Sequence, residues 1–176
     1  MVWLASAGPS SRSNSKGCSV VSAFVSFTQT KPDIFGGPPL TMPMTQSEFE
    51  QRNRQLPDTP ERRAVADLLS RSIVEKPIDP LIACPELSNE LDKAGIVHGP
   101  AAVDAALNYA SAKARSPDRP LYVLAMRLPL VSADGNFAIV EMTYSSAVYK
   151  SGDTLLLRKG ADGRWKETAK LRSWVS

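Results

Sequence analysis

The amino-acid sequence predicts an α+β fold in which two or three N-terminal helices pack on a curved, four-stranded antiparallel meander sheet. Helix-type spacing of apolar residues dominates residues 59–115, and strand-type alternation with short turns dominates residues 121–176. The 176 residues are 43% hydrophobic and 22% charged, which is typical of a globular protein. This composition excludes a wholly disordered chain, a collagen-like repeat and a disulfide-rich mini-protein.

Residues 1–58 are expected to be a disordered or weakly ordered tail and linker, followed by a single domain over residues 59–176. The first 45 residues contain eight Ser, four Gly and five Pro, a composition that resists ordered packing. The apolar run Cys18–Phe27 interrupts this tail, and a short strand, a signal-peptide core or another targeting segment are open alternatives. A translation start at Met42 or Met44 is a further alternative, in which residues 1–41 carry no function.

Two main helices are expected ahead of the sheet. Thr59-Pro60-Glu61 is a typical helix start, with threonine as N-cap, proline at the first position and an acid in the first turn. Apolar residues at helical spacing extend this helix to about Glu75. The second helix covers residues 100–115, where a narrow Ala-rich stripe permits close packing against a sheet. A shorter helix is expected from Ser47 through Arg54.

Four strands are expected after the helices, over residues 121–131, 137–150, 154–159 and 164–175. Asp134-Gly135 is a typical hairpin turn between the first two. In the last strand the odd positions from Trp165 to Val175 are mostly apolar, so we expect them to face the core and the even positions to face solvent. Because short turns join consecutive strands, an antiparallel meander is expected, with the two helices covering one face.

The closing strands carry a resemblance to a known family. Tyr149–Gly152, Leu155–Lys159 and Asp162–Lys166, together with the order of helices followed by a meander, resemble the nuclear-transport-factor-2-like (cystatin-like cone) superfamily over residues 59–176. The long early helix of that superfamily is shorter here and broken by proline. The resemblance implies a cone-shaped pocket between helices and sheet. It implies no single activity, because its members include isomerases, dehydratases, secretion-system subunits and ligand-free interaction domains.

A ligand pocket is expected between the second helix and the first two strands. The residues expected to line it are Leu107, Tyr122, Met126, Met142 and Tyr144. Tyr149 is expected on the opposite face of the strand that carries Tyr144. The two positions differ by five, and strand residues whose positions differ by an odd number point to opposite faces.

Catalytic candidates are few, and the sequence contains no phosphate loop, nucleophile elbow or metalloprotease motif. His98 is the only histidine, and as a general base it needs an acid such as Asp104 or Glu141. In a pocket, Glu141 would have a raised pKa and act as acid or base, while Tyr144 would donate to a carbonyl ligand. We favour the structural alternatives: a loop histidine, a cross-strand carboxylate and a core tyrosine.

The last strand carries a candidate basic face, formed by Lys166, Lys170 and Arg172. Residues 150–176 contain seven basic and three acidic side chains, whereas the whole chain has a net charge of only +3. Nucleic-acid contact through this face is the functional alternative. A solvated outer face of the sheet is favoured, because a dedicated nucleic-acid binder normally has a larger basic excess.

Cys18 and Cys84 are expected to be unpaired thiols, with a single disulfide as the open alternative. Because one histidine and two separated cysteines do not complete a usual zinc set, no metal site is expected, and no cofactor is expected either. No apolar run reaches the length that spans a bilayer. The sequence favours a cytoplasmic location, with an N-terminal targeting segment left open.

The favoured hypothesis is a non-catalytic α+β module that binds a partner protein or a small apolar ligand. The alternative is a small cone-fold isomerase, dehydratase or hydrolase that uses Glu141 or His98 as acid or base. Nucleic-acid binding through the last strand is a third, less favoured hypothesis. The sequence identifies no partner, and a protein partner or a homodimer stays open.

Overall fold

The computed structural model describes residues 11–27, 32–37, 45–52, 58–113, 121–146 and 149–175. The helices of this part are α1 (Ser11–Phe27), α2 (Gln46–Arg52), α3 (Pro60–Val74), α4 (Pro80–Ala83), α5 (Pro85–Lys93) and α6 (Pro100–Lys113). The strands are β1 (Ile34–Gly36), β2 (Val97–His98), β3 (Val123–Met126), β4 (Leu130–Val131), β5 (Phe137–Ser145), β6 (Lys150–Lys159) and β7 (Trp165–Val175). No helix among these residues is both long and apolar enough to cross a membrane.

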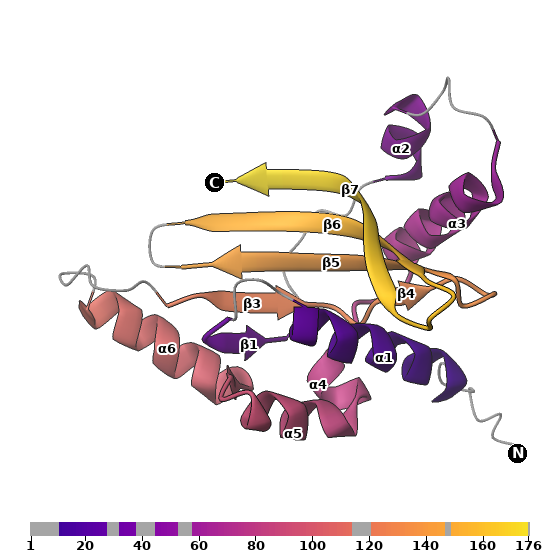
Figure 1. Cartoon of the computed structure of the whole chain (residues 1–176). Coiled ribbons are helices and arrows are strands. Elements are labelled where there is room, and N and C mark those ends of the chain that lie inside the picture. Colours follow the sequence, from indigo (N-terminus) through magenta and orange to yellow (C-terminus); the bar gives the residue numbers. More distant parts are fainter. Residues whose placement is uncertain are drawn as a thin grey trace, which may run out of the picture.

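The described strands form one mixed sheet of seven strands in the order β2-β1-β3-β5-β6-β7, with β4 paired to β5. Figure 1 shows β1, β3, β5, β6 and β7 side by side in this order. The α+β class is therefore confirmed, but the expected four-stranded antiparallel sheet is wrong. Strands β5, β6 and β7 do form an antiparallel meander. The sheet extends further because β1 pairs in parallel with both β2 and β3. These short strands give little periodicity in the sequence.

Two expected strands end earlier than their sequence pattern suggests. The run over residues 121–131 is divided into β3 and β4, because Pro129 has no backbone N–H to continue the ladder. The strand expected over residues 137–150 ends at Ser145, and Lys150 already belongs to β6.

The structure places a helix and a strand where the sequence analysis expects a weakly ordered tail. Helix α1 buries Val20 and Val21 completely, and Gly17 is buried with them. A Cβ atom at Gly17 would lie 2.9 Å from Leu128 Cγ, so the missing side chain allows α1 to approach the sheet closely. The run Cys18–Phe27 is thus part of an amphipathic helix, whose apolar residues recur at three- and four-residue intervals.

The helix starts follow local capping chemistry. Thr59 caps α3, because its side chain accepts a hydrogen bond from the Arg62 backbone N–H at 3.1 Å. Thr45, and not Ser47, is the N-cap of α2. The Thr45 hydroxyl accepts a hydrogen bond from the Glu48 backbone N–H at 3.1 Å, and the Glu48 carboxylate accepts one from the Thr45 backbone N–H at 2.8 Å. This reciprocal pair is a capping box.

The two faces of the sheet carry separate apolar cores. One core joins α1 and α5 to the face of β5 that contains Val140 and Met142. The other joins α2 and α3 to the face that contains Phe137 and Ile139. Because neighbouring strand residues point to opposite faces, α1 and α3 lie on opposite sides of the sheet. The fold therefore has three layers, one more than the sequence predicted.

Cys18 of α1 and Cys84, between α4 and α5, form a disulfide with a Cα–Cα distance of 5.5 Å. The prediction of two unpaired thiols is wrong. It relied on the different character of the two sequence segments, whereas the fold packs α1 directly against α4 and α5.

Candidate ligand-binding cleft

A cleft of about 930 Å³ lies on the α1 side of the sheet, over β5, β6 and β7. Its aromatic and aliphatic lining comes from α1, from β5, β6 and β7, and from the segments just before β3 and β6: Phe24, Tyr122, Met142, Tyr144, Tyr149, Leu155, Leu157 and Trp165. Its polar lining residues are Ser151, Asp153, Arg164, Lys166, Glu167 and Lys170. The cleft thus combines a broad apolar surface with a small set of charged groups, as small-molecule sites usually do.

The strand register explains why these side chains meet. Tyr144 of β5 lies opposite Ser151 of β6, and Met142 lies opposite Asp153. Directly opposite residues share a face of the sheet, so these four side chains form one surface. The end of α1 contributes Phe24 from the covering layer.

The main polar feature of the cleft is the pair Asp153 and Lys170. Lys170 Nζ lies 3.1 Å from Asp153 Oδ2. The Asp153 side chain is only 14% exposed, whereas the Lys170 side chain is 49% exposed. Asp153 Oδ1 is buried and has no hydrogen-bond partner among the described residues. One carboxylate oxygen is therefore paired with a half-exposed cation, and the other is left unsatisfied by the described residues.

Two aromatic side chains also have polar groups available in this region. The Trp165 indole N–H is buried without a partner in the described part of the chain. Burial raises the pKa of the Tyr144 phenol to about 12, and the nearby carboxylates of Asp153 and Glu167 add to the rise. Tyr144 is therefore protonated and neutral at physiological pH.

The cleft contains three of the five expected pocket residues, Tyr122, Met142 and Tyr144. Met126 is fully buried in the core on the same side of the sheet and does not line the cleft. The side chain of Leu107 lies outside the described residues. Tyr149 was expected opposite Tyr144, but it lines the same cleft because β5 ends before it.

Glu141 lies on the other side of the sheet, in the interior. Its Oε2 atom accepts a hydrogen bond from Arg127 Nη1 at 3.2 Å, and the two side chains are 2% and 5% exposed. Burial raises the pKa of Glu141, while the positive charge of Arg127 and hydrogen bonds from Arg127 and Ser72 counteract the rise. Its neighbour Met142 faces the cleft, so Glu141 points away from it.

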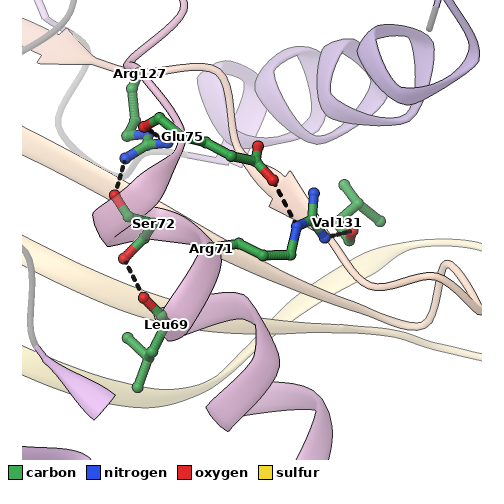
Figure 2. A network of polar contacts seen from close by, with 6 residues as sticks. All are labelled: Leu69, Arg71, Ser72, Glu75, Arg127 and Val131. Atoms are coloured by element: carbon green, nitrogen blue, oxygen red, sulfur yellow. Dashed lines mark hydrogen bonds and ion pairs between the residues drawn. The ribbon is translucent and has the colours of Figure 1, made fainter. Parts of the chain in front are cut away.

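Arg127 connects the sheet to the C-terminal end of α3 (Figure 2). Its Nη1 atom donates to the Ser72 carbonyl oxygen at 2.9 Å, and its Nη2 atom donates to the Glu75 carbonyl oxygen at 3.4 Å. These carbonyls lack partners within the helix, and a cation at this end also complements the helix dipole. Arg71 donates to the Val131 carbonyl oxygen at 3.0 Å and so ties the same helical turn to β4. These contacts of Arg71 and Arg127 hold the end of α3 on the sheet, which is a structural role.

His98 lies in β2, separated from β5 by β1 and β3. Its Nε2 atom lies 3.1 Å from Asp92 Oδ1 on the neighbouring α5. Neither expected acid partner, Asp104 or Glu141, forms this contact. The three catalytic candidates therefore occupy three separate places: His98 in β2, Glu141 in the α3-side core and Tyr144 in the cleft. Among the described residues, no three His, Cys, Asp or Glu side chains are grouped to hold a metal ion.

No family model, curated protein or solved structure matches this chain.

The expected basic face of the last strand is divided. The β6–β7 pairing has two register shifts, between Thr154 and Leu155 and between Leu156 and Leu157. Lys170 is consequently opposite Leu155 and Arg172 is opposite Thr154, which places these two basic residues on opposite faces. Lys166 lies 3.6 Å from Asp162 and Lys170 pairs with Asp153.

The two register shifts are β-bulges, and they show that the expectation of core-facing odd positions and solvent-facing even positions along β7 is wrong. Trp165 is buried on the α1 side, while Ala169 and Leu171 pack against the α3-side core. Val175, expected in the core, is 66% exposed. Each bulge adds one residue to β7, and an added residue exchanges the faces for every position beyond it.

Phe24, Asp153 and Trp165 are cleft residues that the sequence analysis did not assign to a pocket. Phe24 lies in the expected tail, within the apolar run Cys18–Phe27, which was the available signal. Asp153 lies between the strands expected over residues 137–150 and 154–159, although it belongs to the interior of β6. An acidic residue shortly before the apolar run Leu155–Leu157 was the available signal there.

Proposed function

We propose that this chain is a non-catalytic α+β module that binds a small apolar ligand in the cleft between α1 and the β5–β7 face. The observation that carries the proposal is the cleft itself, about 930 Å³ in volume and lined by five aromatic side chains. Pockets of this size typically enclose most of a drug-sized molecule. Aromatic side chains supply large apolar contact area with few rotatable bonds.

The separation of the acid-base candidates supports binding over catalysis. Glu141 is bound to Arg127 on the far side of the sheet, and His98 is bound to Asp92 at the β2 edge. Acid-base catalysis requires such groups within hydrogen-bond reach of one reacting atom. The enzyme hypothesis is therefore not retained, and the divided basic residues of β7 give nucleic-acid binding no support either. The cone-fold resemblance stays a prediction.

The cellular location follows from the disulfide in this proposal. A cytoplasmic location was expected from the sequence, but cytosolic proteins normally keep their thiols reduced. The bond between Cys18 and Cys84 supports an oxidising compartment instead. Alkylation of native protein at the moment of cell lysis, followed by intact-mass analysis, tests this: two labelled thiols would support the cytoplasm.

Titration with Nile red, a neutral dye whose emission rises in apolar surroundings, tests the binding proposal. We expect saturable binding of one dye per chain. Tyr149→Ala removes an exposed aromatic wall of the cleft and should weaken binding about fivefold. Because Tyr149 is 42% exposed, its removal should leave the circular dichroism spectrum and melting temperature close to those of the wild type.

Two matched controls complete the experiment. Ile82→Ala removes a side chain that is 81% exposed and lies outside the cleft, and it should not change the affinity for the dye. His98→Ala should also leave binding unchanged. Absence of saturable binding, or equal affinity of the Tyr149→Ala variant and the wild type, would refute the proposal.

A further inference from the structure

The carboxylate of Asp153 is placed where a ligand in the cleft would meet it. It comes from the middle strand of the meander, opposite Met142, with Tyr144 and Trp165 also lining the cleft. Its Oδ1 atom has no hydrogen-bond partner among the described residues, and its Oδ2 atom is paired with the ammonium of Lys170. A carboxylate in an apolar, aromatic surface is costly unless a cation or several donors satisfy it.

The cation that satisfies Asp153 is half-exposed. Lys170 extends from the edge strand β7, and its side chain remains 49% exposed, whereas the Asp153 side chain is only 14% exposed. The Lys170 ammonium can therefore regain its hydration in solvent, so the cost of separating the pair falls mainly on the Asp153 carboxylate. A second cation that reaches Asp153 from the cleft would offset that cost.

Two carboxylates, Asp153 and Glu167, act on the inner part of the cleft beside Tyr144, while three basic side chains, Arg164, Lys166 and Lys170, also line it. Burial raises the pKa of Tyr144, and both carboxylates add to the rise. Tyr122, Tyr144 and Tyr149 also line the cleft, and the face of an aromatic ring attracts cations. The basic side chains at the rim are partly engaged elsewhere, since Lys166 lies 3.6 Å from Asp162.

We propose that the cleft selects an apolar molecule that carries a protonated amine, and that this amine replaces the Lys170 ammonium at Asp153. The aromatic and aliphatic lining holds the apolar body. Asp153 receives the ammonium, and Lys170 moves to solvent. This inference rests on the proposed function, which it deepens by naming the ligand class and the residue that recognises it.

Competition against bound Nile red tests the inference with two probes of equal length, 3-phenylpropylamine and 3-phenylpropan-1-ol. Both can donate a hydrogen bond, so the comparison isolates the positive charge. We expect the amine to displace the dye at about tenfold lower concentration than the alcohol in low salt. The difference should decrease as salt is added, because the added ions screen the charges.

Two substitutions should act in opposite directions. Asp153→Asn should remove the tenfold preference for the amine, while Lys170→Met should increase amine affinity about threefold because the competing cation is gone. Neither should change the affinity for the alcohol. A merely structural role for the pair predicts parallel losses for both probes in both variants. Glu90→Gln on α5, which is exposed and outside the cleft, is the matched charge control.

The outcomes separate this inference from the proposed function. Equal displacement by amine and alcohol, or an unchanged preference in Asp153→Asn, would overturn the amine inference and leave the apolar cleft standing. Failure of both probes to displace bound dye would also overturn it. If Nile red does not bind, the proposed function and the amine inference are both wrong.

Discussion

Removal of the disulfide between Cys18 and Cys84 should destabilise the protein by about 4 kcal/mol. The two cysteines are 66 positions apart, so the bond closes a long loop in the unfolded chain. In the chain-entropy model, the stabilisation that a disulfide provides grows with the logarithm of the loop length, and a loop of this size gives about 4 kcal/mol at 25 °C. The substitution Cys18→Ala with Cys84→Ala removes the bond without leaving a polar group in the core.

Urea unfolding followed by circular dichroism measures this loss. With a slope of about 2 kcal/mol per molar urea, the midpoint of the double variant should be about 2 M lower than that of the oxidised wild type. Dithiothreitol should lower the wild-type midpoint by a similar amount and should not affect the double variant, which serves as its control. Equal midpoints for the wild type and the double variant would refute the loop-closure reasoning. Two free thiols in the folded, air-exposed wild type would refute the pairing.

Three further predictions concern the α3 side of the sheet and the packing of α1 against Leu128. Arg127→Met leaves the Glu141 carboxyl group buried without its cation and should cost about 3–5 kcal/mol in urea unfolding, whereas Arg127→Met combined with Glu141→Leu should recover much of this loss. A larger loss in the double variant would contradict this explanation. Burial raises the pKa of Glu141 in the folded state above its ordinary value of 4.5, so the folded protein holds this proton at pH values where the unfolded chain releases it. The unfolding free energy of the wild type, relative to Glu141→Gln, should therefore fall as the pH rises through that interval, and a constant difference between pH 4 and 7 would contradict the raised pKa. Gly17→Ala should lower the melting temperature, because the new Cβ would lie 2.9 Å from Leu128 Cγ and 3.0 Å from the Pro129 carbonyl oxygen. An exposed glycine in a helix would instead gain about 1 kcal/mol from the same change, so an increase in melting temperature would exclude close packing at this point.

Local signals in the sequence predicted those elements whose stability is largely local. Thr59 and Pro60 fix the start of α3 by chemistry within one turn, and the Asp134-Gly135 turn joins β4 to β5. The meander of β5, β6 and β7 also followed from alternation and short turns. These features depend on residues that are close in the sequence, so a single sequence was enough to find them.

The elements that the sequence analysis missed are stabilised by distant contacts. Strand β1 has three residues, and its order comes from pairing with β2 and β3 on both sides. Helix α1 is rich in serine, but Val20 and Val21 pack in a core supplied by other segments. The bulges of β7 exchange the two faces without any proline or glycine at the shifted positions. Composition and periodicity carry little information about such pairings.

The two outer layers of the fold are attached to the sheet in different ways, and this difference bears on the cleft. On the α3 side, Arg127 joins the helix end to the sheet through buried hydrogen bonds and the Glu141 ion pair. On the α1 side, a covalent bond to Cys84 holds the helix that supplies Phe24 to the cleft. The cross-link thus holds this wall of the cleft together with the buried Val20 and Val21, while the Arg127 network supports the sheet beneath it. If the proposed ligand contacts Phe24, its binding and disulfide formation should favour one another by linkage.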